Sequence, residues 1–262
     1  MAKVTVITAT TGNPILRKCL ESVAMQNHLD VQHLILIDGP TAKNKVQALL
    51  APDEISSRHI DIINLPYPIG QDRWNGHRIY AAGTFMAEGD YVMFLDDDNY
   101  IDSDHITDCL KVIDAGNDWA YSFRKIVDKA GKVICNDDCE SLGKWPSILD
   151  QEDYFIDVNC YFLPISIAVQ LTPQWYRKAR EQGQIEVDRA MAYELRKSGL
   201  KFDSTFRYSV NYTVGSTPIS VQAEFFLSGN ERMKNKNNGK NPWQMNIPNE
   251  NLDSLASSAI LL

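Results

Sequence analysis

The sequence predicts an α/β protein with a mostly parallel sheet and helices on both of its faces. Short apolar runs alternate with helical patterns through the first 116 residues, which is the order of elements in such sheets. The composition is that of an ordinary globular domain, since 44% of the 262 residues are hydrophobic and 23% are charged. A chain of this length can bury a large core.

Four apolar runs in the first half predict buried strands, and the patterns between them predict helices. Strands are expected over residues 4–8, 33–37, 60–65 and 91–95. Asn13 and Pro14 supply a cap and a first-turn proline for the first helix. Later helices are expected over residues 42–50, 79–86 and 103–116. Because ligands bind beyond the carboxyl ends of parallel strands, the polar residues that follow each strand are the expected site.

The second half of the chain is less regular. The expected elements are a hairpin, a polar loop, a strand and a helix, over residues 119–135, 137–153, 155–163 and 188–198. After Gly229 the chain is rich in Asn and Lys, and no regular structure is predicted for most of it.

Charge and cysteine content exclude some partners and indicate a location. The net charge of -8 and the pI of about 5.1 argue against a nucleic acid partner, because an acidic protein repels a phosphate backbone. Five scattered cysteines and the lack of a signal-peptide pattern predict a cytoplasmic location. The uncharged stretch 158–176 is too polar for a membrane span. Peripheral association with the inner face of the membrane stays open.

Three consecutive carboxylates, Asp96, Asp97 and Asp98, follow the fourth predicted strand. Two like charges about 4 Å apart repel by roughly 1 kcal/mol in water and roughly 4 kcal/mol near a protein surface. A cation or hydrogen-bond donors between them would relieve that repulsion. Oxygen ligands of this kind suit Mg²⁺ or Mn²⁺, completed by water and substrate phosphates. The simpler interpretation is an acidic surface turn whose side chains accept hydrogen bonds from loop amides.

Two other metal motifs can be tested by their spacing. An EF-hand loop needs Gly at its sixth position, and counting from Asp96 that position is Ile101, which excludes this motif. A phosphatase of the aspartyl-phosphate type also places Asp-x-Asp after an apolar strand. That strand usually opens the fold, whereas here three predicted strands come first, so this alternative is disfavoured but stays open.

The ordered motifs resemble those of glycosyltransferase family 2, the large group with the GT-A fold. The resemblance covers about the first 200 residues. Its segments are the opening strand and nucleotide loop, the turn after the second strand, the Gly-rich segment, the Asp-x-Asp motif and the start of a late helix: residues 4–10, 37–41, 70–89, 94–98 and 187–199.

This resemblance implies a metal-dependent glycosyltransferase of the hexosyltransferase type. Such an enzyme moves a sugar from a nucleotide-diphosphate sugar, here expected to be a UDP-sugar, to an acceptor hydroxyl with inversion. The expected cofactor is Mn²⁺ or Mg²⁺, and the expected acceptor is a glycan or a lipid-linked acceptor in surface polysaccharide synthesis. A GT-A (Rossmann-like) domain is expected over residues 1–229, with a nucleotide-binding half (1–100) and an irregular acceptor-side half (101–229), followed by a C-terminal tail (230–262).

The resemblance also assigns roles to individual residues. It implies Asp188 as the catalytic base and Asp96 and Asp98 as the metal ligands. Arg73 is added because an acidic protein must supply positive charge to a diphosphate, and Asn159 because its predicted strand approaches the donor sugar. The residues expected at the donor are Thr8, Ala9, Thr10, Asp38, Arg73, Asp96, Asp97 and Asn159.

Several alternatives stay open. Val187 stands where the family has Glu before the base, so Glu186 is a second candidate for that role. Asp188 can also be a helix N-cap and Asp38 a turn-closing residue. A sugar nucleotidyltransferase would want a Gly-rich, basic phosphate loop after the first strand, and a degenerate transferase would only bind carbohydrate or a partner. A dinucleotide-binding oxidoreductase is disfavoured because no Gly-x-Gly-x-x-Gly follows the first strand.

Overall fold

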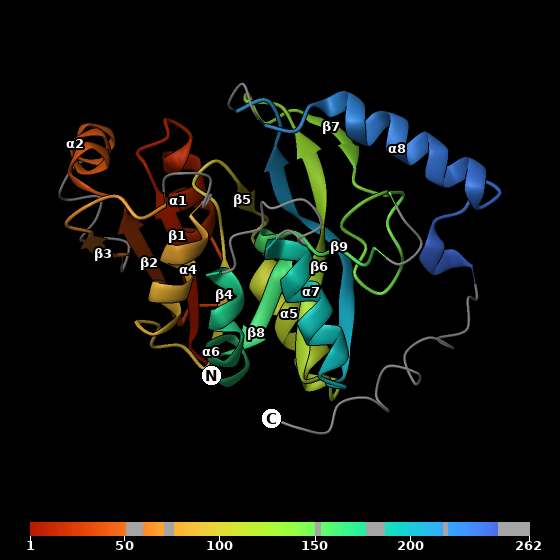
Figure 1. Cartoon of the computed structure of the whole chain (residues 1–262), viewed down its shortest axis with the longest axis horizontal. Helices are drawn as coiled ribbons and strands as arrows, with labels where there is room; N and C mark the ends of the chain where they lie inside the picture. The colour runs from red at the N-terminus through yellow and green to blue at the C-terminus, as the bar shows by residue number, and fades with distance from the viewer. Residues whose placement is uncertain (51–59, 71–75, 150–152, 177–186, 217–219, 246–262) are drawn as a thin grey trace.

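A computed structural model shows a mixed sheet with helices packed on both faces (Figure 1). It describes residues 1–50, 60–70, 76–149, 153–176, 187–216 and 220–245. Within these residues the sheet has nine strands, in the order β3-β2-β1-β4-β8-β6-β9-β5, with β7 paired to β6. The predicted α/β fold is confirmed.

The first half alternates strands and helices as predicted. The strands are β1 (Val4–Thr10), β2 (Val31–Ile37), β3 (Ile60–Asn64) and β4 (Tyr91–Phe94). The helices are α1 (Leu16–Ala24), α2 (Pro40–Leu49), α4 (His77–Thr84) and α5 (His105–Asp114). The four strands are parallel in the order β3-β2-β1-β4, so their carboxyl ends lie at one edge of the sheet.

The second half has mixed pairings. The strands are β5 (Tyr100–Ile101), β6 (Trp119–Val127), β7 (Val133–Asn136), β8 (Tyr161–Pro164) and β9 (Phe202–Thr213). The helical elements are α6 (Ile165–Trp175), α7 (Val187–Lys197), α8 (Ala223–Lys236) and the 3₁₀ turns η1 (Val158–Cys160) and η2 (Pro242–Gln244). β6 and β9 are parallel, whereas β8 is antiparallel to both β4 and β6. The predicted hairpin is confirmed as β6 and β7.

The structure corrects one predicted strand and adds elements that were not predicted. The strand expected over 155–163 is wrong, because residues 158–160 form η1 and only the short β8 follows. β9 and α6 were not predicted. β9 pairs with β6, which lies far away along the chain, and such a partner leaves no local periodicity to detect. The tail expected from residue 230 begins inside α8.

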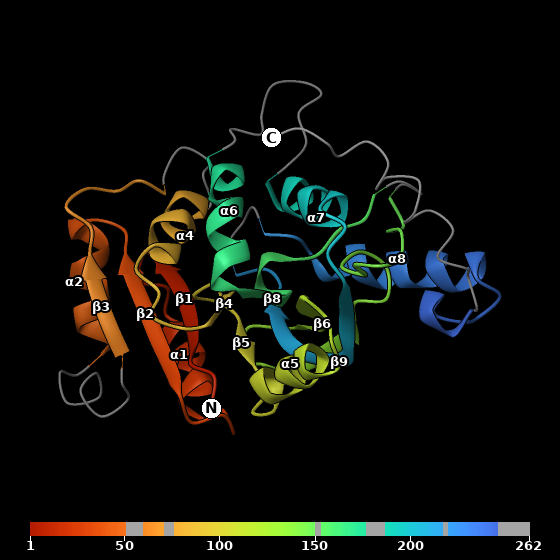
Figure 2. The ribbon, with the colours of Figure 1, turned by 90° about the horizontal axis from the view of Figure 1, so that it is seen from below.

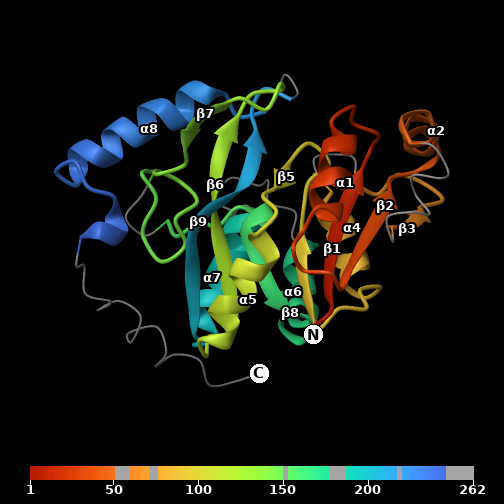
Figure 3. The same cartoon turned by 180° about the vertical axis from the view of Figure 1, so that it is seen from behind.

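The helices form two layers on the sheet. α4, α6 and α7 lie on one face, and α1 and α5 lie on the other (Figure 2, Figure 3). Large apolar side chains fill the space between the layers, and Trp119, Trp175 and Phe94 are fully buried there. Trp119 of β6 stacks on Phe202 of β9 with ring centroids 4.3 Å apart. Burial of side chains of this size contributes about 1.5–3 kcal/mol each.

α8 packs beside β7 in the second half of the fold (Figure 1). Phe226 and Met233 of α8 belong to one buried cluster with Ile126 of β6 and with Cys139. All five cysteines are free. No helix in the described ranges combines the length and the apolar character needed to cross a bilayer.

Replacement of Gly83 tests the close contact between α4 and the sheet. A Cβ at this position would lie 2.7 Å from Ile7 Cγ2 and 3.1 Å from Leu36 Cδ1. We expect Gly83→Ala to destabilise the protein by about 1 kcal/mol, because overpacking costs about 1–3 kcal/mol and exceeds the gain in helix propensity of about 1 kcal/mol. Urea unfolding measures the change, and Ala82→Gly measures the propensity difference next to it. A stabilised Gly83→Ala protein would contradict the tight contact.

Candidate active site

The acidic cluster, residues 96–98, follows β4 at the edge where the carboxyl ends of β1 and β4 lie side by side. The Leu95 N–H donates to the Ile7 carbonyl at 2.9 Å, which continues the pairing one residue beyond β4. The chain then turns, because the Asn99 N–H donates to the Asp96 carbonyl at 3.1 Å. The three carboxylates therefore lie at the edge where parallel sheets bind ligands.

Asp97 connects the cluster to the loop after β1. The Thr10 hydroxyl donates to Asp97 Oδ2 at 2.5 Å, and the Asn13 N–H approaches the same oxygen at 3.4 Å. The Gly12 N–H donates to the Thr10 hydroxyl at 2.9 Å. Two residues predicted at the donor, Thr10 and Asp97, are thus brought together.

Both carboxylate oxygens of Asp96 accept hydrogen bonds. The Tyr80 hydroxyl donates to Oδ1, and Asn159 Nδ2 donates to Oδ2 at 2.8 Å. The Asp96 N–H donates in turn to Asn159 Oδ1 at 2.6 Å. Asn159 is fully buried, so it holds Asp96 and does not present the predicted contact to a sugar.

The carboxylates of the acidic cluster have raised pKa values. Burial is the largest cause, and it raises the pKa from 3.8 to about 7 for Asp96 and to about 6 for Asp97 and Asp98. The charge of Asp98 raises the pKa of Asp96 further, whereas a hydrogen bond from Ser216 lowers the pKa of Asp98. Among the described residues, no Lys, Arg or His side chain forms an ion pair with this cluster.

The acidic cluster offers an incomplete set of metal ligands. In the described ranges no three His, Cys, Asp or Glu side chains are grouped so that they could hold a metal ion. Asp97 is turned toward Thr10, whereas the partly exposed Asp96 and Asp98 are the remaining carboxylates that an ion could contact. Mg²⁺ is usually held by one or two carboxylates together with substrate phosphates and water. The residues therefore fit an ion whose coordination is completed by a phosphate-bearing ligand.

Asp188 lies in the first turn of α7, one residue inside the helix. Its Oδ1 is 3.3 Å from His77 Nε2, and its side chain is 26% exposed. Oδ1 accepts no hydrogen bond from the described residues, because the contact with His77 lacks hydrogen-bond geometry. The charge of Asp188 acts on two buried neighbours and raises the pKa of Asp157 and Tyr161.

Helix α4 links Asp188 to the acidic cluster. His77 contacts Asp188 and Tyr80 donates to Asp96, and these two α4 residues are one turn apart. Three residues advance about 4.5 Å along a helix. Asp96 and Asp188 therefore lie at the same end of the sheet.

The structure changes the role of Thr8. Its hydroxyl is fully buried and lies 3.0 Å from His33 Nε2 and 3.8 Å from Cys19 Sγ. Successive strand residues face opposite sides, and the Thr8 side chain faces the core, so a donor contact of Thr8 stays a prediction that this side chain does not support. Ala9 is partly buried, and a Cβ at Gly76 would lie 3.3 Å from its Cβ. Its donor contact stays a prediction.

Asp38 closes a turn in the described structure. The Ile69 N–H donates to Asp38 Oδ1 at 2.7 Å, and the Gly70 N–H donates to Oδ2 at 3.1 Å. The turn-closing role is therefore present, and a role at the donor stays a prediction. Arg73 and Glu186 lie outside the described residues.

Three side chains around the site were not predicted from the sequence: Tyr80, His77 and Arg124. Arg124 carries a charge in the middle of the apolar run 119–127, and a charge in a buried strand requires charged partners. That signal was present in the sequence. Tyr80 and His77 left no such signal, because their partners are distant in the sequence.

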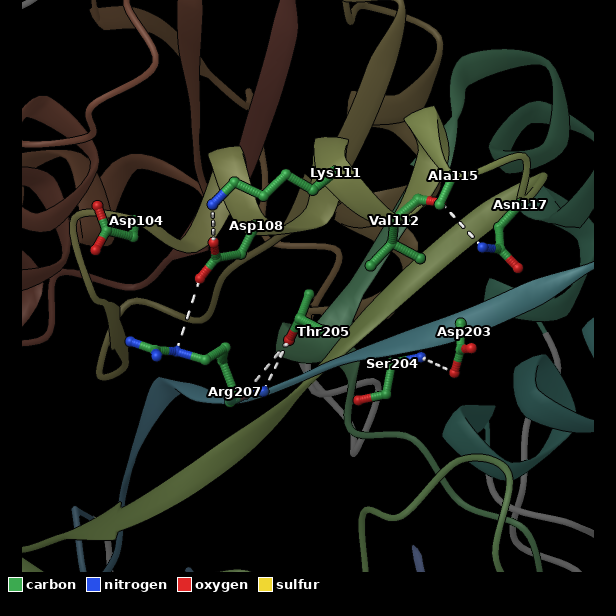
Figure 4. Close-up of a pocket in the computed structure, with 10 residues that line it drawn as sticks. All are labelled: Asp104, Asp108, Lys111, Val112, Ala115, Asn117, Asp203, Ser204, Thr205 and Arg207. Carbon is green, nitrogen blue, oxygen red and sulfur yellow. Dashed lines mark hydrogen bonds and ion pairs between the residues drawn. The ribbon is translucent and has the colours of Figure 1, made fainter.

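A recess of about 450 Å³ lies between α5 and β9, away from the acidic cluster (Figure 4). Asp108 lies between Lys111 and Arg207 in this recess, with N···O distances of 2.7 and 3.8 Å. None of the predicted site residues lines it. Because its charges pair with one another, the recess is not the candidate active site.

Residues 5–134, which include β1 apart from Val4, β4 and the acidic cluster, match the model of glycosyl transferase family 2. The chain belongs to this family. A search of curated proteins gives no match.

This glycosyltransferase family 2 chain shares its fold with solved structures of S. aureus TarS. Over 97% of this chain, S. aureus TarS is 16% identical with a TM-score of 0.61, and the chain covers 42% of that structure. S. aureus TarS 1–349 in complex with UDP-GlcNAc is 16% identical over 97% of this chain and 70% of that one, with a TM-score of 0.58. The same TarS segment in complex with UDP is 17% identical over 97% and 69%, also with a TM-score of 0.58. At identities this low, the comparison establishes a common fold and nothing more.

The raised pKa values predict how the stability of the metal-free protein depends on pH. Each carboxyl of the acidic cluster holds its proton to a higher pH in the folded chain than in the unfolded chain. Its contribution to stability is therefore fully present below about pH 4 and is lost as the pH rises through about 6–7. Thermal unfolding in chelator from pH 5 to 8 should show this loss, and Asp98→Asn should reduce its slope. An identical slope in both proteins would contradict the raised pKa of Asp98.

Proposed function

We propose that this chain is a metal-dependent, inverting glycosyltransferase that moves a sugar from a UDP-sugar to a hydroxyl of a glycan or lipid-linked acceptor. The observation that carries the proposal is the position of two acidic groups. The acidic cluster follows β4, and Asp188 lies at the same end of the sheet, connected through α4. A group transfer needs one acidic site for the leaving diphosphate and another for the incoming hydroxyl.

The donor class is supported by the family and by the fold. TarS, which shares the fold, has been solved in complex with UDP-GlcNAc and with UDP. Asp98 and Asp96 would hold Mn²⁺ or Mg²⁺, and the bound ion would offset the negative charge that develops on the diphosphate. Thr10 and Asp97 would shape the loop beside the nucleotide, and Asp38 and Arg73 are proposed at the donor on the family pattern.

Asp188 is proposed as the general base. Its carboxylate would take the proton of the acceptor hydroxyl, whose oxygen forms the new bond to the anomeric carbon. The bond from that carbon to the diphosphate oxygen breaks on the opposite side, so the configuration inverts and the nucleoside diphosphate leaves with the electron pair. His77, 3.3 Å from Oδ1, would restrict the orientation of the carboxylate. We place this reaction in surface polysaccharide synthesis, in the cytoplasm or at the inner face of the membrane.

A test of donor binding separates the metal site from the rest of the molecule. We expect UDP-sugars from a nucleotide-sugar panel, added with Mn²⁺, to raise the midpoint of thermal unfolding. At a ligand concentration 100 times Kd, the free energy of unfolding should increase by about 2.7 kcal/mol. Asp98→Asn should abolish this gain because the ion loses a ligand, whereas Asp108→Asn, the same change in the distant recess, should keep it. Stabilisation of Asp98→Asn equal to wild type would refute the metal assignment.

The general base can be tested by the kinetics of transfer. Asp188→Asn should lower kcat by roughly 10²–10⁴-fold, because an amide cannot take the hydroxyl proton. Its affinity for Mn²⁺ and UDP, measured by calorimetry, should stay close to that of wild type. Wild-type kcat in this variant would transfer the role to another acid such as Glu186. Donor binding by wild type without any turnover would favour a degenerate transferase instead.

A further inference from the structure

A polar network connects Asp96 with the start of α7; three of its five members are buried, and the other two, Glu140 and Arg189, are partly buried. It consists of Asn159, Asp157, Arg124, Glu140 and Arg189, and we call these five residues the buried network. Its residues come from β6, the loop before β8, η1 and α7, so it crosses the second half of the fold. None of these side chains is assigned a catalytic step in the proposed function.

The first link is the Asn159 carboxamide, whose orientation is set by its partners. The Asp96 N–H donates to Oδ1 at 2.6 Å, so the oxygen must lie on that side. The amide nitrogen then faces two carboxylates, Asp96 Oδ2 at 2.8 Å and Asp157 Oδ1 at 2.7 Å. A rotated amide would place two donors together and two acceptors against one another. The carboxamide therefore has one stable orientation, and that orientation fixes the Asp96 carboxylate.

The second link is Arg124, a fully enclosed guanidinium in the middle of β6. Nη1 donates to Asp157 Oδ2, Nε donates to Asp137 Oδ2 at 2.8 Å and Nη2 donates to Glu140 Oε2 at 2.7 Å. Arg124 also lies over the Tyr212 ring, 4.4 Å from its centroid. A planar guanidinium with all three nitrogens bonded cannot rotate, so it fixes the positions of the Asp157 and Glu140 carboxylates.

The third link reaches α7. Glu140 Oε1 is 3.4 Å from Arg189 Nη2, and Arg189 Nε donates to Asp153 Oδ1 at 2.8 Å. Arg189 directly follows Asp188 in the sequence. The buried network therefore begins at the donor-side carboxylate and ends beside the proposed base.

We propose that the buried network is a positioning device that sets the Asp96 carboxylate through Asn159 and the start of α7 through Glu140 and Arg189. The proposal rests on the proposed function. Its members do not touch substrate and are positioning residues. A need for stability alone would not favour this arrangement, because well-packed apolar side chains often replace a buried ion-pair cluster without loss of stability.

Substitutions at the two ends of the network should have different effects, one on binding and one on turnover. Asn159→Ala should weaken the binding of UDP with Mn²⁺ by roughly 10- to 100-fold, the usual result of removing a residue that orients a metal ligand. Glu140→Gln should leave this affinity within about 2-fold of wild type but lower kcat by about 10-fold. Arg189 of α7 keeps Asp153 as a partner but loses the charged partner that connects it to Arg124, and a misplaced base slows transfer.

Asn211→Ala is the matched control, since Asn211 is also a buried amide and bonds Tyr100 and Asp102. Calorimetry with UDP and Mn²⁺, turnover of the best donor of the panel, and thermal unfolding are measured for all four proteins. The proposal is overturned if Asn159→Ala binds UDP as tightly as Asn211→Ala, if both lose affinity in step with their unfolding midpoints, or if Glu140→Gln turns over at the wild-type rate. Wild-type protein that binds no UDP in Mn²⁺ would instead refute the proposed function, and this inference with it.

Asp157→Asn keeps the inference testable if Asn159→Ala does not fold. The substitution preserves shape but removes the charge that binds Arg124. It should weaken UDP and Mn²⁺ binding in the same direction and by less than Asn159→Ala. Wild-type affinity in a folded Asp157→Asn protein would overturn the link between Arg124 and Asp96.

Discussion

Charge repulsion within the acidic cluster is the constraint on which the rest of the site depends. Three adjacent carboxylates at the end of β4 repel one another, and burial makes their charged forms less favourable still. Neutral donors alone stabilise them in the described structure: Thr10 bonds Asp97, whereas Tyr80 and Asn159 bond Asp96. Each donor restricts a carboxylate without neutralising it. The site is thus oriented by hydrogen bonds and keeps the excess negative charge that attracts a cation.

Two separate routes connect this cluster with Asp188. The route through α4 is short, since Tyr80 and His77 are one turn apart and helix geometry sets their spacing. Trp175 packs against both rings, with centroids 5.6 Å from Tyr80 and 5.5 Å from His77, and so joins α6 to this route. The route through the buried network is longer and consists of ion pairs and hydrogen bonds. If the contacts of one route shifted, those of the other would still hold Asp96 and Asp188 in place. Support from two sides can keep separated groups within a fraction of an ångström of their positions.

The sequence predicted the half of the fold that is built from local patterns. β1, β2, β3 and β4 are apolar runs with helices between them, and a parallel sheet of this kind brings their ends together by topology alone. The acidic cluster was predicted for the same reason. β9 was missed because its partner β6 is remote in sequence, and Asn159 was assigned to a sugar because η1 was taken for a strand. Burial decides such roles: Thr8 and Asn159 are polar residues near the right strand ends, and both are fully enclosed.

The incomplete ligand set of the cluster also bears on how an acidic protein can bind a diphosphate. With a net charge of -8 the chain repels the donor as a whole. Asp96 and Asp98 supply too few oxygens to complete an octahedral ion, so an ion held there keeps open positions for phosphate oxygens. Binding of the ion and binding of the donor would then favour each other by the same factor, as linkage requires. Under the proposed function, such a site would discriminate against ions without a donor and against donors without an ion, and its occupancy would depend on both.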